Sequence, residues 1–116
     1  MKDQRAYERI RCSHYLKVYE QKSGKCIGSI FDISKRGIRV VHDHPLDDRK
    51  TIDLKIHLPE EGILGDSISI IAEKRWTKTR REDGAHETGF EIVGEINSGL
   101  YSVQTLVNDL KKKAAG

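Results

Sequence analysis

Apolar and polar residues alternate along most of this chain, and a period of two is typical of half-buried β-strands. The clearest case runs from Ile52 to Leu58, where every second residue is isoleucine or leucine and those between are aspartate, lysine and histidine. The same alternation, or a β-branched composition, predicts an extended backbone in further stretches. These are residues 15–19, 26–31, 38–41, 67–79 and 87–93. Polar connections separate them, so the pattern predicts six strands with antiparallel pairing.

Each predicted strand carries one apolar face that must be covered. Closing the sheet into a small barrel buries this face and also removes exposed strand edges. We therefore predict an all-β fold, a six-stranded antiparallel β-barrel over residues 13–95.

The two ends of the chain have different patterns. Apolar residues recur at spacings of three and four within residues 97–113, which predicts one amphipathic C-terminal helix. Asn97 or Ser98 can cap its start. Residues 1–12 are charge-dense and lack periodicity, so we predict an N-terminal arm outside the barrel.

The composition limits the class of function. The chain has 116 residues, which suits a single domain, and 21 basic against 18 acidic residues give a net charge of +3. That balance does not favour a protein that binds duplex DNA by counterion release, and a small anion is the better-matched partner. The N-terminus lacks the apolar stretch of a signal peptide and no apolar run is long enough to cross a bilayer. We therefore expect a cytoplasmic protein without an integral membrane segment.

The sequence offers little for metal binding or catalysis. Cys12 and Cys26 lack metal-ligand spacing, and His42 and His44 flank an aspartate in a charged loop, where histidines are usually solvated. There is no nucleophile elbow or carboxylate pair, and a barrel of this size leaves little interior for a catalytic pocket. We predict no metal, no cofactor and no enzymatic activity.

Arg5 and Arg9 lie four residues apart, a spacing that places both side chains on one face of either a helix or a strand. Their guanidinium groups offer planar donor forks to phosphate oxygens or to a guanine edge. They repel each other in an empty site, so a dianionic ligand would order the arm that carries them. Taken alone, such a pair is more often a solvated surface feature.

A second cluster, Asp32-Ile33-Ser34-Lys35-Arg36-Gly37, predicts a turn between two strands. Ionised Asp32 only accepts hydrogen bonds, and guanine presents N1–H and N2–H₂ side by side, so this carboxylate would select guanine over adenine. Ser34 could serve the base or hold the aspartate, and Gly37 could adopt a positive φ or let a purine approach the backbone. The simpler alternative is an Asx or Ser turn closed by glycine.

In this order, near the start of an all-β chain, the two clusters resemble the signature of the PilZ family of cyclic di-GMP receptors, RxxxR followed by (D/N)xSxxG. Both motifs match without a substitution. Residues 71–76 and 88–92 more loosely resemble the family's late strand pair. The resemblance implies a six-stranded barrel with a C-terminal helix and a flexible N-terminal arm that wraps the ligand.

The resemblance also implies roles for individual residues. Arg5 and Arg9 would bind ligand phosphates and the Hoogsteen edge of guanine, while Asp32, Ser34 and the backbone near Gly37 would take the other edge. Further candidates for ligand contact are Gln4, Lys35, Arg36, Arg39 and Trp76.

These further candidates have specific alternatives. Lys35 and Arg36 are expected more as exposed turn residues, although either could lean toward a phosphate. Arg39 is equally expected as a solvent-side strand residue, and Trp76 is expected more as part of the barrel core or rim than as a stacking platform. Family members that capture two stacked ligand molecules tend to carry an arginine just before RxxxR. Gln4 occupies that position here, which favours one ligand per site.

The sequence therefore predicts a non-catalytic second-messenger receptor, in which cyclic di-GMP binds, the arm folds over it, and an unidentified partner protein recognises the changed surface. The output would be regulation of motility, of biofilm formation or of another process, and the sequence does not decide between them. One alternative is an adaptor with the same barrel that works through protein contacts without a nucleotide. A weaker one is a small RNA-binding barrel, since four Tyr, two Phe and one Trp are few for base stacking.

Overall fold

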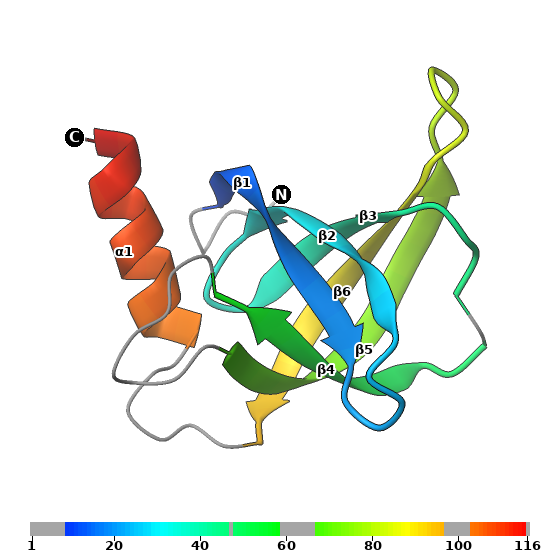
Figure 1. The fold of residues 1–116 in the computed structure, drawn as a ribbon, viewed down its shortest axis with the longest axis horizontal. Helices are drawn as coiled ribbons and strands as arrows, with labels where there is room; N and C mark the ends of the chain where they lie inside the picture. The colour runs from blue at the N-terminus through cyan, green and yellow to red at the C-terminus, as the bar shows by residue number, and fades with distance from the viewer. Residues whose placement is uncertain (1–8, 47, 59–66, 97–102, 116) are drawn as a thin grey trace, which may run out of the picture.

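A computed structural model describes residues 9–46, 48–58, 67–96 and 103–115 of the chain (Figure 1). The elements follow one another as β1 (Ile10–Glu20), β2 (Cys26–Ile33), β3 (Gly37–His42), β4 (Thr51–His57), β5 (Ser67–Thr79), β6 (His86–Glu95) and α1 (Val103–Ala115). The predicted all-β fold with a C-terminal helix is confirmed.

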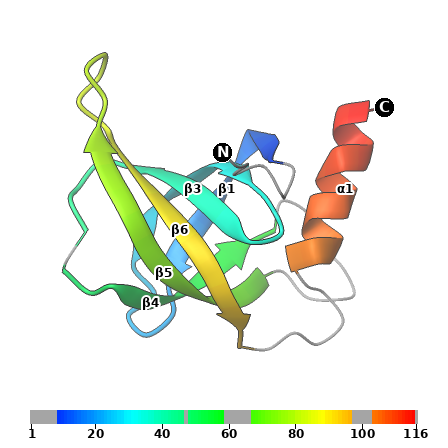
Figure 2. The ribbon, with the colours of Figure 1, turned by 180° about the vertical axis from the view of Figure 1, so that it is seen from behind.

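The strands form a closed barrel in the order β1-β2-β3-β6-β5-β4, and each neighbouring pair is antiparallel. The barrel closes where β1 pairs with β4, with Val18 opposite Ile56. Seen from behind, β5 and β6 cross the barrel side by side and extend beyond it as a hairpin (Figure 2). Every strand of the sheet therefore has a neighbour on both sides, as the prediction of a closed barrel requires.

Alternate residues of the strands point into the barrel and form its core. Most are isoleucine, leucine or valine, and those without any exposed surface include Val18, Ile30, Ile38, Val40, Leu54, Ile56 and Ile70. Branched side chains pack well on a pleated sheet. Burying each of them stabilises the fold by about 1.5–3 kcal/mol.

Helix α1 lies beside the barrel, at the end of the molecule opposite the β5–β6 hairpin (Figures 1 and 2). Its apolar stripe, Val103, Leu106 and Val107, is buried in the same core as the strands. The carboxylate of Glu95, the last residue of β6, accepts a hydrogen bond from the backbone N–H of Val103 at 3.3 Å. This contact satisfies one of the donors that a helix start leaves unpaired.

The helix ends at Ala115, two residues beyond the predicted end. The predicted start at residue 97 and the predicted caps Asn97 and Ser98 lie outside the described residues.

Two predicted boundaries are wrong. The arm was expected to run to residue 12, but β1 begins at Ile10, which pairs with Ile33 of β2. The turn expected from Asp32 to Gly37 is shorter, because Asp32 and Ile33 still belong to β2 and Gly37 already belongs to β3. In both places pairing with a strand distant in sequence extends the element, and a local pattern does not reveal such pairing.

His42 is buried at the end of β3, where the sequence predicted a solvated loop histidine. Its Nδ1 donates to the carbonyl oxygen of His44 at 2.8 Å, and its Nε2 accepts from the hydroxyl of Thr88 at 2.7 Å. Burial lowers the pKa of His42. The ring is therefore a neutral, hydrogen-bonded part of the barrel wall.

Two further features concern the described part of the chain only. No helix there is long and apolar enough to span a membrane. No three His, Cys, Asp or Glu side chains come together there in a way that could hold a metal ion.

Candidate functional site

The connection between β2 and β3 is a tight turn organised by Ser34. The buried hydroxyl of Ser34 accepts hydrogen bonds from the backbone N–H groups of Arg36 and Gly37, at 3.3 and 3.2 Å. The backbone N–H of Ser34 donates to the carbonyl of Gly37 at 2.8 Å, and the carbonyl of Arg36 accepts from the N–H of Ile92 in β6 at 2.7 Å. The Ser34 oxygen therefore fixes the turn itself, and its predicted contact with the base stays a prediction.

Gly37 is needed for close approach of the backbone rather than for a positive φ. The residues with positive φ in the described chain are Gly24 and Gly84. A Cβ at Gly37 would lie 2.9 Å from the carbonyl oxygen of Phe90 and 3.5 Å from a guanidinium nitrogen of Arg9. The absence of a side chain therefore lets β3 and β6 pack tightly beneath Arg9.

Asp32 lies at the end of β2 with its carboxylate held between two arginines. Oδ1 accepts from Nη1 of Arg9 at 2.6 Å, and Oδ2 accepts from Nε and Nη2 of Arg39 at 3.1 and 2.6 Å. Ladder pairing creates this arrangement, because Ile10, which follows Arg9, lies opposite Ile33 and because Asp32 lies opposite Arg39. The side chain of Asp32 is only 6% exposed, whereas that of Arg9 is 47% exposed.

Arg39 lies on the outside of the barrel, where its side chain is 31% exposed and contacts several protein groups. Two of its nitrogens donate to Asp32, and the third, Nη1, lies 3.6 Å from Oε1 of Glu87. Its guanidinium plane lies over the ring of Phe31, 4.5 Å from the centroid, and Arg11 lies 4.4 Å from the same ring. Arg39 is therefore on the outer face of β3, as the alternative of a solvent-side strand residue predicts, with its guanidinium held by protein groups; its contact with a ligand stays a prediction.

A hollow of about 430 Å³ opens beside this turn, within the usual size of small-molecule sites. It carries three arginines and one tryptophan, and it is lined by Arg9, Ser34, Arg36, Gly37, Arg75, Trp76, Gly89, Phe90 and Glu91. Its walls come from the turn, from β5 and from β6. Positive charge beside a planar aromatic ring is a combination that can hold a nucleotide.

Trp76 is 42% exposed and lies on the outside of the barrel, so of the two positions expected for it, core or rim, the core is wrong. Its indole lies against the backbone of β6, since a Cβ at Gly89 would be 2.3 Å from Nε1. Gly89 therefore provides the flat surface on which the indole rests.

Arg75 is the arginine of this hollow that was not among the predicted site residues; Gly89, Phe90 and Glu91 were not among them either. It is paired with Glu73 at 3.0 Å and also with Glu91. The β5–β6 register shifts between Lys74 and Trp76, so Arg75 sits at a bulge. A bulge interrupts the alternation of faces, and β5 is exposed at every residue from Arg75 to Thr79, so a period of two does not predict which of these residues line the hollow.

The structure thus brings together Arg9, Ser34, Arg36, Gly37 and Trp76 at one hollow, with Asp32 and Arg39 directly behind Arg9. Lys35 is exposed at the turn and does not line the hollow. Arg5 and Gln4 lie outside the described residues.

The negative charge of Asp32 is also felt in β1. Burial, and secondly the carboxylate of Asp32, raise the pKa of the Cys12 thiol to about 11. Cys12 is therefore a protonated, buried thiol, while Cys26 is exposed.

Fold and hollow together define a small closed β-barrel domain with an arginine-lined surface site at the β2–β3 turn. The sequence model of the PilZ domain matches residues 3–108, which is most of the chain. The protein therefore belongs to the PilZ domain family. A comparison with curated proteins finds no match.

Two solved structures are similar to this chain. One is the inhibitor of motility MotI/DgrA of Bacillus subtilis, with a TM-score of 0.76 and 22% identity over 98% of this chain and 52% of that one. The other is the PilZ domain of YcgR from Escherichia coli with c-di-GMP, with a TM-score of 0.66 and 15% identity over 97% of this chain and 95% of that one. The present chain spans about half of the MotI/DgrA chain. At these identities the likeness establishes the shared fold.

Proposed function

We propose that this chain is a non-catalytic receptor for cyclic di-GMP, which binds in the hollow beside the β2–β3 turn. The observation that carries the proposal is the carboxylate of Asp32, held by Arg9 and Arg39 at the edge of an arginine-lined hollow. The presence of c-di-GMP in the structure of the YcgR PilZ domain supports the same ligand.

Asp32 is the group that would select guanine. Its two oxygens can accept from N1–H and N2–H₂ of guanine, whereas the N1 of adenine is itself an acceptor. Oδ1 is engaged by Arg9 in the ligand-free chain. Guanine would therefore replace Arg9 at this oxygen, and its second donor would compete for Oδ2 with Arg39, which holds the carboxylate in place before the ligand arrives.

Arg9 would gain a new partner when it leaves Asp32. Its side chain is half-exposed and borders the hollow, so its guanidinium can turn to a phosphate or to the Hoogsteen edge of the base. Arg5 would act beside it from the arm. The exchange moves the start of β1, because Arg9 directly precedes Ile10.

The other walls of the hollow suit the rest of the ligand. Arg36 and Arg75 bring positive charge to the side where phosphates would lie, and the exposed indole of Trp76 offers a plane for a purine. We propose one ligand per site.

The output would be a protein contact. Ligand binding orders the arm, and a downstream protein in the cytoplasm would recognise the new surface. The similarity to an inhibitor of motility makes control of motility one candidate output.

Site variants test this proposal. In a titration of fluorescein-labelled cyclic di-GMP followed by anisotropy, Arg9→Ala and Asp32→Ala should each weaken binding about 100-fold or more, because each removes charged hydrogen bonds worth about 1.5–3 kcal/mol apiece. Arg49→Ala is the matched control, since it removes an exposed arginine that pairs with Glu20 away from the hollow. Unchanged affinity in both site variants, with the fold intact by circular dichroism, would refute the assigned residue roles.

A further inference from the structure

A row of alternating charges connects the candidate site to the tip of the β5–β6 hairpin. We call it the charge chain, and it consists of Asp32, Arg39, Glu87, Arg80 and Asp83. Arg39 lies 2.6 Å from Asp32 and 3.6 Å from Glu87. Arg80 lies 3.4 Å from Glu87 and 2.8 Å from Asp83. Each arginine is thus shared between two carboxylates.

Glu87 has the longest ion-pair distances in the charge chain. Its side chain is only 9% exposed, and Oε1 is buried without a hydrogen-bond partner among the described residues. Its two counter-charges are both more than 3.3 Å away. A buried carboxylate gains much from a closer partner and loses much when one departs, so the position of Glu87 should respond to small movements of either arginine.

Arg39 is divided unequally between its two carboxylate partners. Two of its nitrogens are committed to Asp32 at short distances and one points at Glu87 at a longer distance. Any ligand group that donates to the carboxylate of Asp32 competes for the same lone pairs. Arg39 would then move toward Glu87, and Glu87 would be drawn away from Arg80.

Arg80 directly follows the last residue of β5 and begins the turn at the tip of the projecting hairpin. Its carbonyl accepts from the N–H of Gly84 at 3.0 Å, and its guanidinium holds Asp83. A hydrogen bond from the backbone N–H of Ala85, and then the Arg80 guanidinium, hold the pKa of Asp83 below its ordinary value. The hairpin tip is therefore ordered by the same arginine that ends the charge chain.

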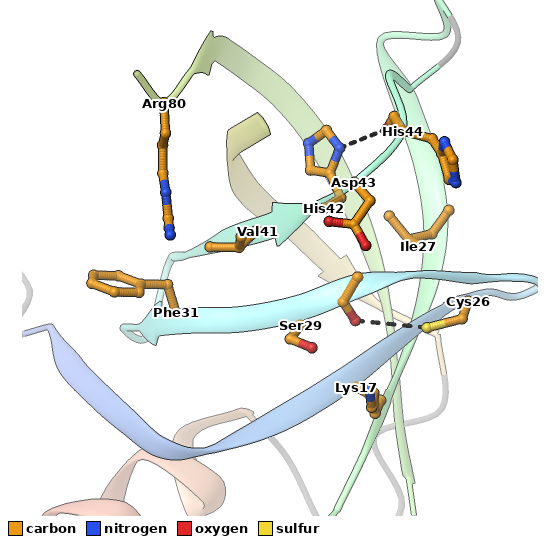
Figure 3. A pocket seen from close by; sticks show the side chains of 11 residues that line it. Lys17, Cys26, Ile27, Ser29, Phe31, Val41, His42, Asp43, His44 and Arg80 are labelled. Carbon is orange, nitrogen blue, oxygen red and sulfur yellow. Dashed lines mark hydrogen bonds between the residues drawn. The ribbon is translucent and has the colours of Figure 1, made fainter. Parts of the chain in front are cut away.

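Arg80 also borders a second hollow of about 410 Å³ on the outside of β2 and β3, where it lies above Phe31 (Figure 3). Phe31 is the ring on which the guanidinium of Arg39 rests. A change in Arg80 would therefore alter the surface around this hollow as well as the hairpin tip.

We propose that Arg39 is a positioning residue that holds Asp32 for guanine and transmits occupancy of the site through Glu87 to Arg80 and the β5–β6 hairpin. This rests on the proposed function, because the ligand is the group that competes with Arg39 for Asp32. The hairpin then belongs to the surface that differs between the free and the bound protein.

Two glycines make the test sharp, because they occupy equivalent places in two hairpins. Gly84 and Gly24 both have a φ of 74°, and each N–H donates to the carbonyl four residues earlier. Gly84 is at the end of the charge chain, and Gly24 is in the β1–β2 hairpin outside it. Their backbone amide signals in a ¹⁵N–¹H NMR spectrum report on the two hairpins in the same sample.

We expect cyclic di-GMP to shift the Gly84 signal in the unaltered chain and to leave Gly24 in place. In Glu87→Gln the ligand should still bind, but the Gly84 shift should be lost. Arg39→Lys should weaken binding about tenfold, since lysine cannot donate the paired hydrogen bonds that hold Asp32. Binding without a shift at Gly84, or a shift that persists in Glu87→Gln, overturns the proposal.

An experiment without ligand distinguishes failure of this proposal from failure of the proposed function. Asp32→Asn removes the charge that holds Arg39, so Gly84 should shift in this variant without any nucleotide, while Gly24 should not. If Gly84 is unmoved, the connection through the charge chain is wrong, whichever ligand the chain binds. If the Gly84 signal shifts in Asp32→Asn but cyclic di-GMP does not bind to the unaltered chain, the connection stands and the ligand assignment fails.

Discussion

Arg9 and Asp32 form a 2.6 Å ion pair although 23 residues separate them in the sequence. The pair joins the residue just before β1 to the second-last residue of β2. It places a half-exposed cation on a nearly buried anion, so the cation can exchange partners more easily than the anion. In our account this exchange is the first step of ligand capture.

Gly37 should be intolerant of even one methyl group. In Gly37→Ala the new Cβ would lie 2.9 Å from the backbone carbonyl of Phe90, and β3 and β6 would have to separate. We expect a loss of about 1–3 kcal/mol in the free energy of unfolding, measured by urea denaturation. Gly94→Ala is the control, because its Cβ would only reach Ile71 at 3.4 Å and should change stability by less than about 0.5 kcal/mol. Equal midpoints for both variants would contradict the packing described here.

Trp76, the only tryptophan, should report ligand binding by its fluorescence. Its exposed indole borders the hollow, so a purine that covers it should quench the emission and shift it to shorter wavelength. Gly89→Ala should reduce this response, because its Cβ would displace the indole, whereas Gly94→Ala should not. A full response in Gly89→Ala would mean that Trp76 does not contact the ligand.

The barrel could be predicted from the sequence because the alternation in Ile52 to Leu58 and in the other predicted strands marks one apolar face of each strand. The motifs in the sequence also indicated Arg9 and Asp32 as site residues. The sequence could not show that these two residues contact each other, since that contact depends on the register in which Ile10 pairs with Ile33. Pairing of this kind joins residues distant in sequence, and local propensity contains no information about it.

The remaining differences have two physical causes. The bulge at Arg75 interrupts the period of two, and every residue of β5 from Arg75 to Thr79 is exposed, so Trp76 lies on the outside of the barrel and not in its core. Glu87 and His42 are buried beside partners that lie elsewhere in the chain: Arg39 and Arg80 lie 3.6 and 3.4 Å from Glu87, and the hydroxyl of Thr88 is hydrogen-bonded to His42. A charged or polar residue is therefore buried or exposed according to partners that its own neighbourhood in the sequence does not show.

His42 should make stability depend on pH. Its pKa in the folded chain is below the ordinary value of 6.5, so the folded state binds the proton less readily than the unfolded state. The contribution is complete above about pH 6.5 and is lost as the pH falls below that value. Thermal unfolding at pH 7.5 and 5.5 should show a smaller drop in Tm for His42→Gln than for the unaltered chain. His44→Gln, which changes an exposed ring, should keep the full drop; an equally steep drop in His42→Gln would remove His42 as the cause.

The two thiols should differ in reactivity. Cys12 is buried with a pKa of about 11, and Cys26 is exposed. At pH 8, Ellman's reagent should modify one thiol per chain in the native protein and two in guanidinium chloride. Cys26→Ser should abolish the native reaction, and rapid labelling of Cys12 in that variant would contradict the packing of β1.

The central claim is that the site beside Asp32 binds cyclic di-GMP, and isothermal titration calorimetry of the unaltered chain tests it most directly. We predict saturable heat with cyclic di-GMP, close to one ligand per chain, and no binding of cyclic di-AMP or GTP at the same concentrations. A folded chain that gives no heat with cyclic di-GMP, or that binds cyclic di-AMP equally well, would contradict the account.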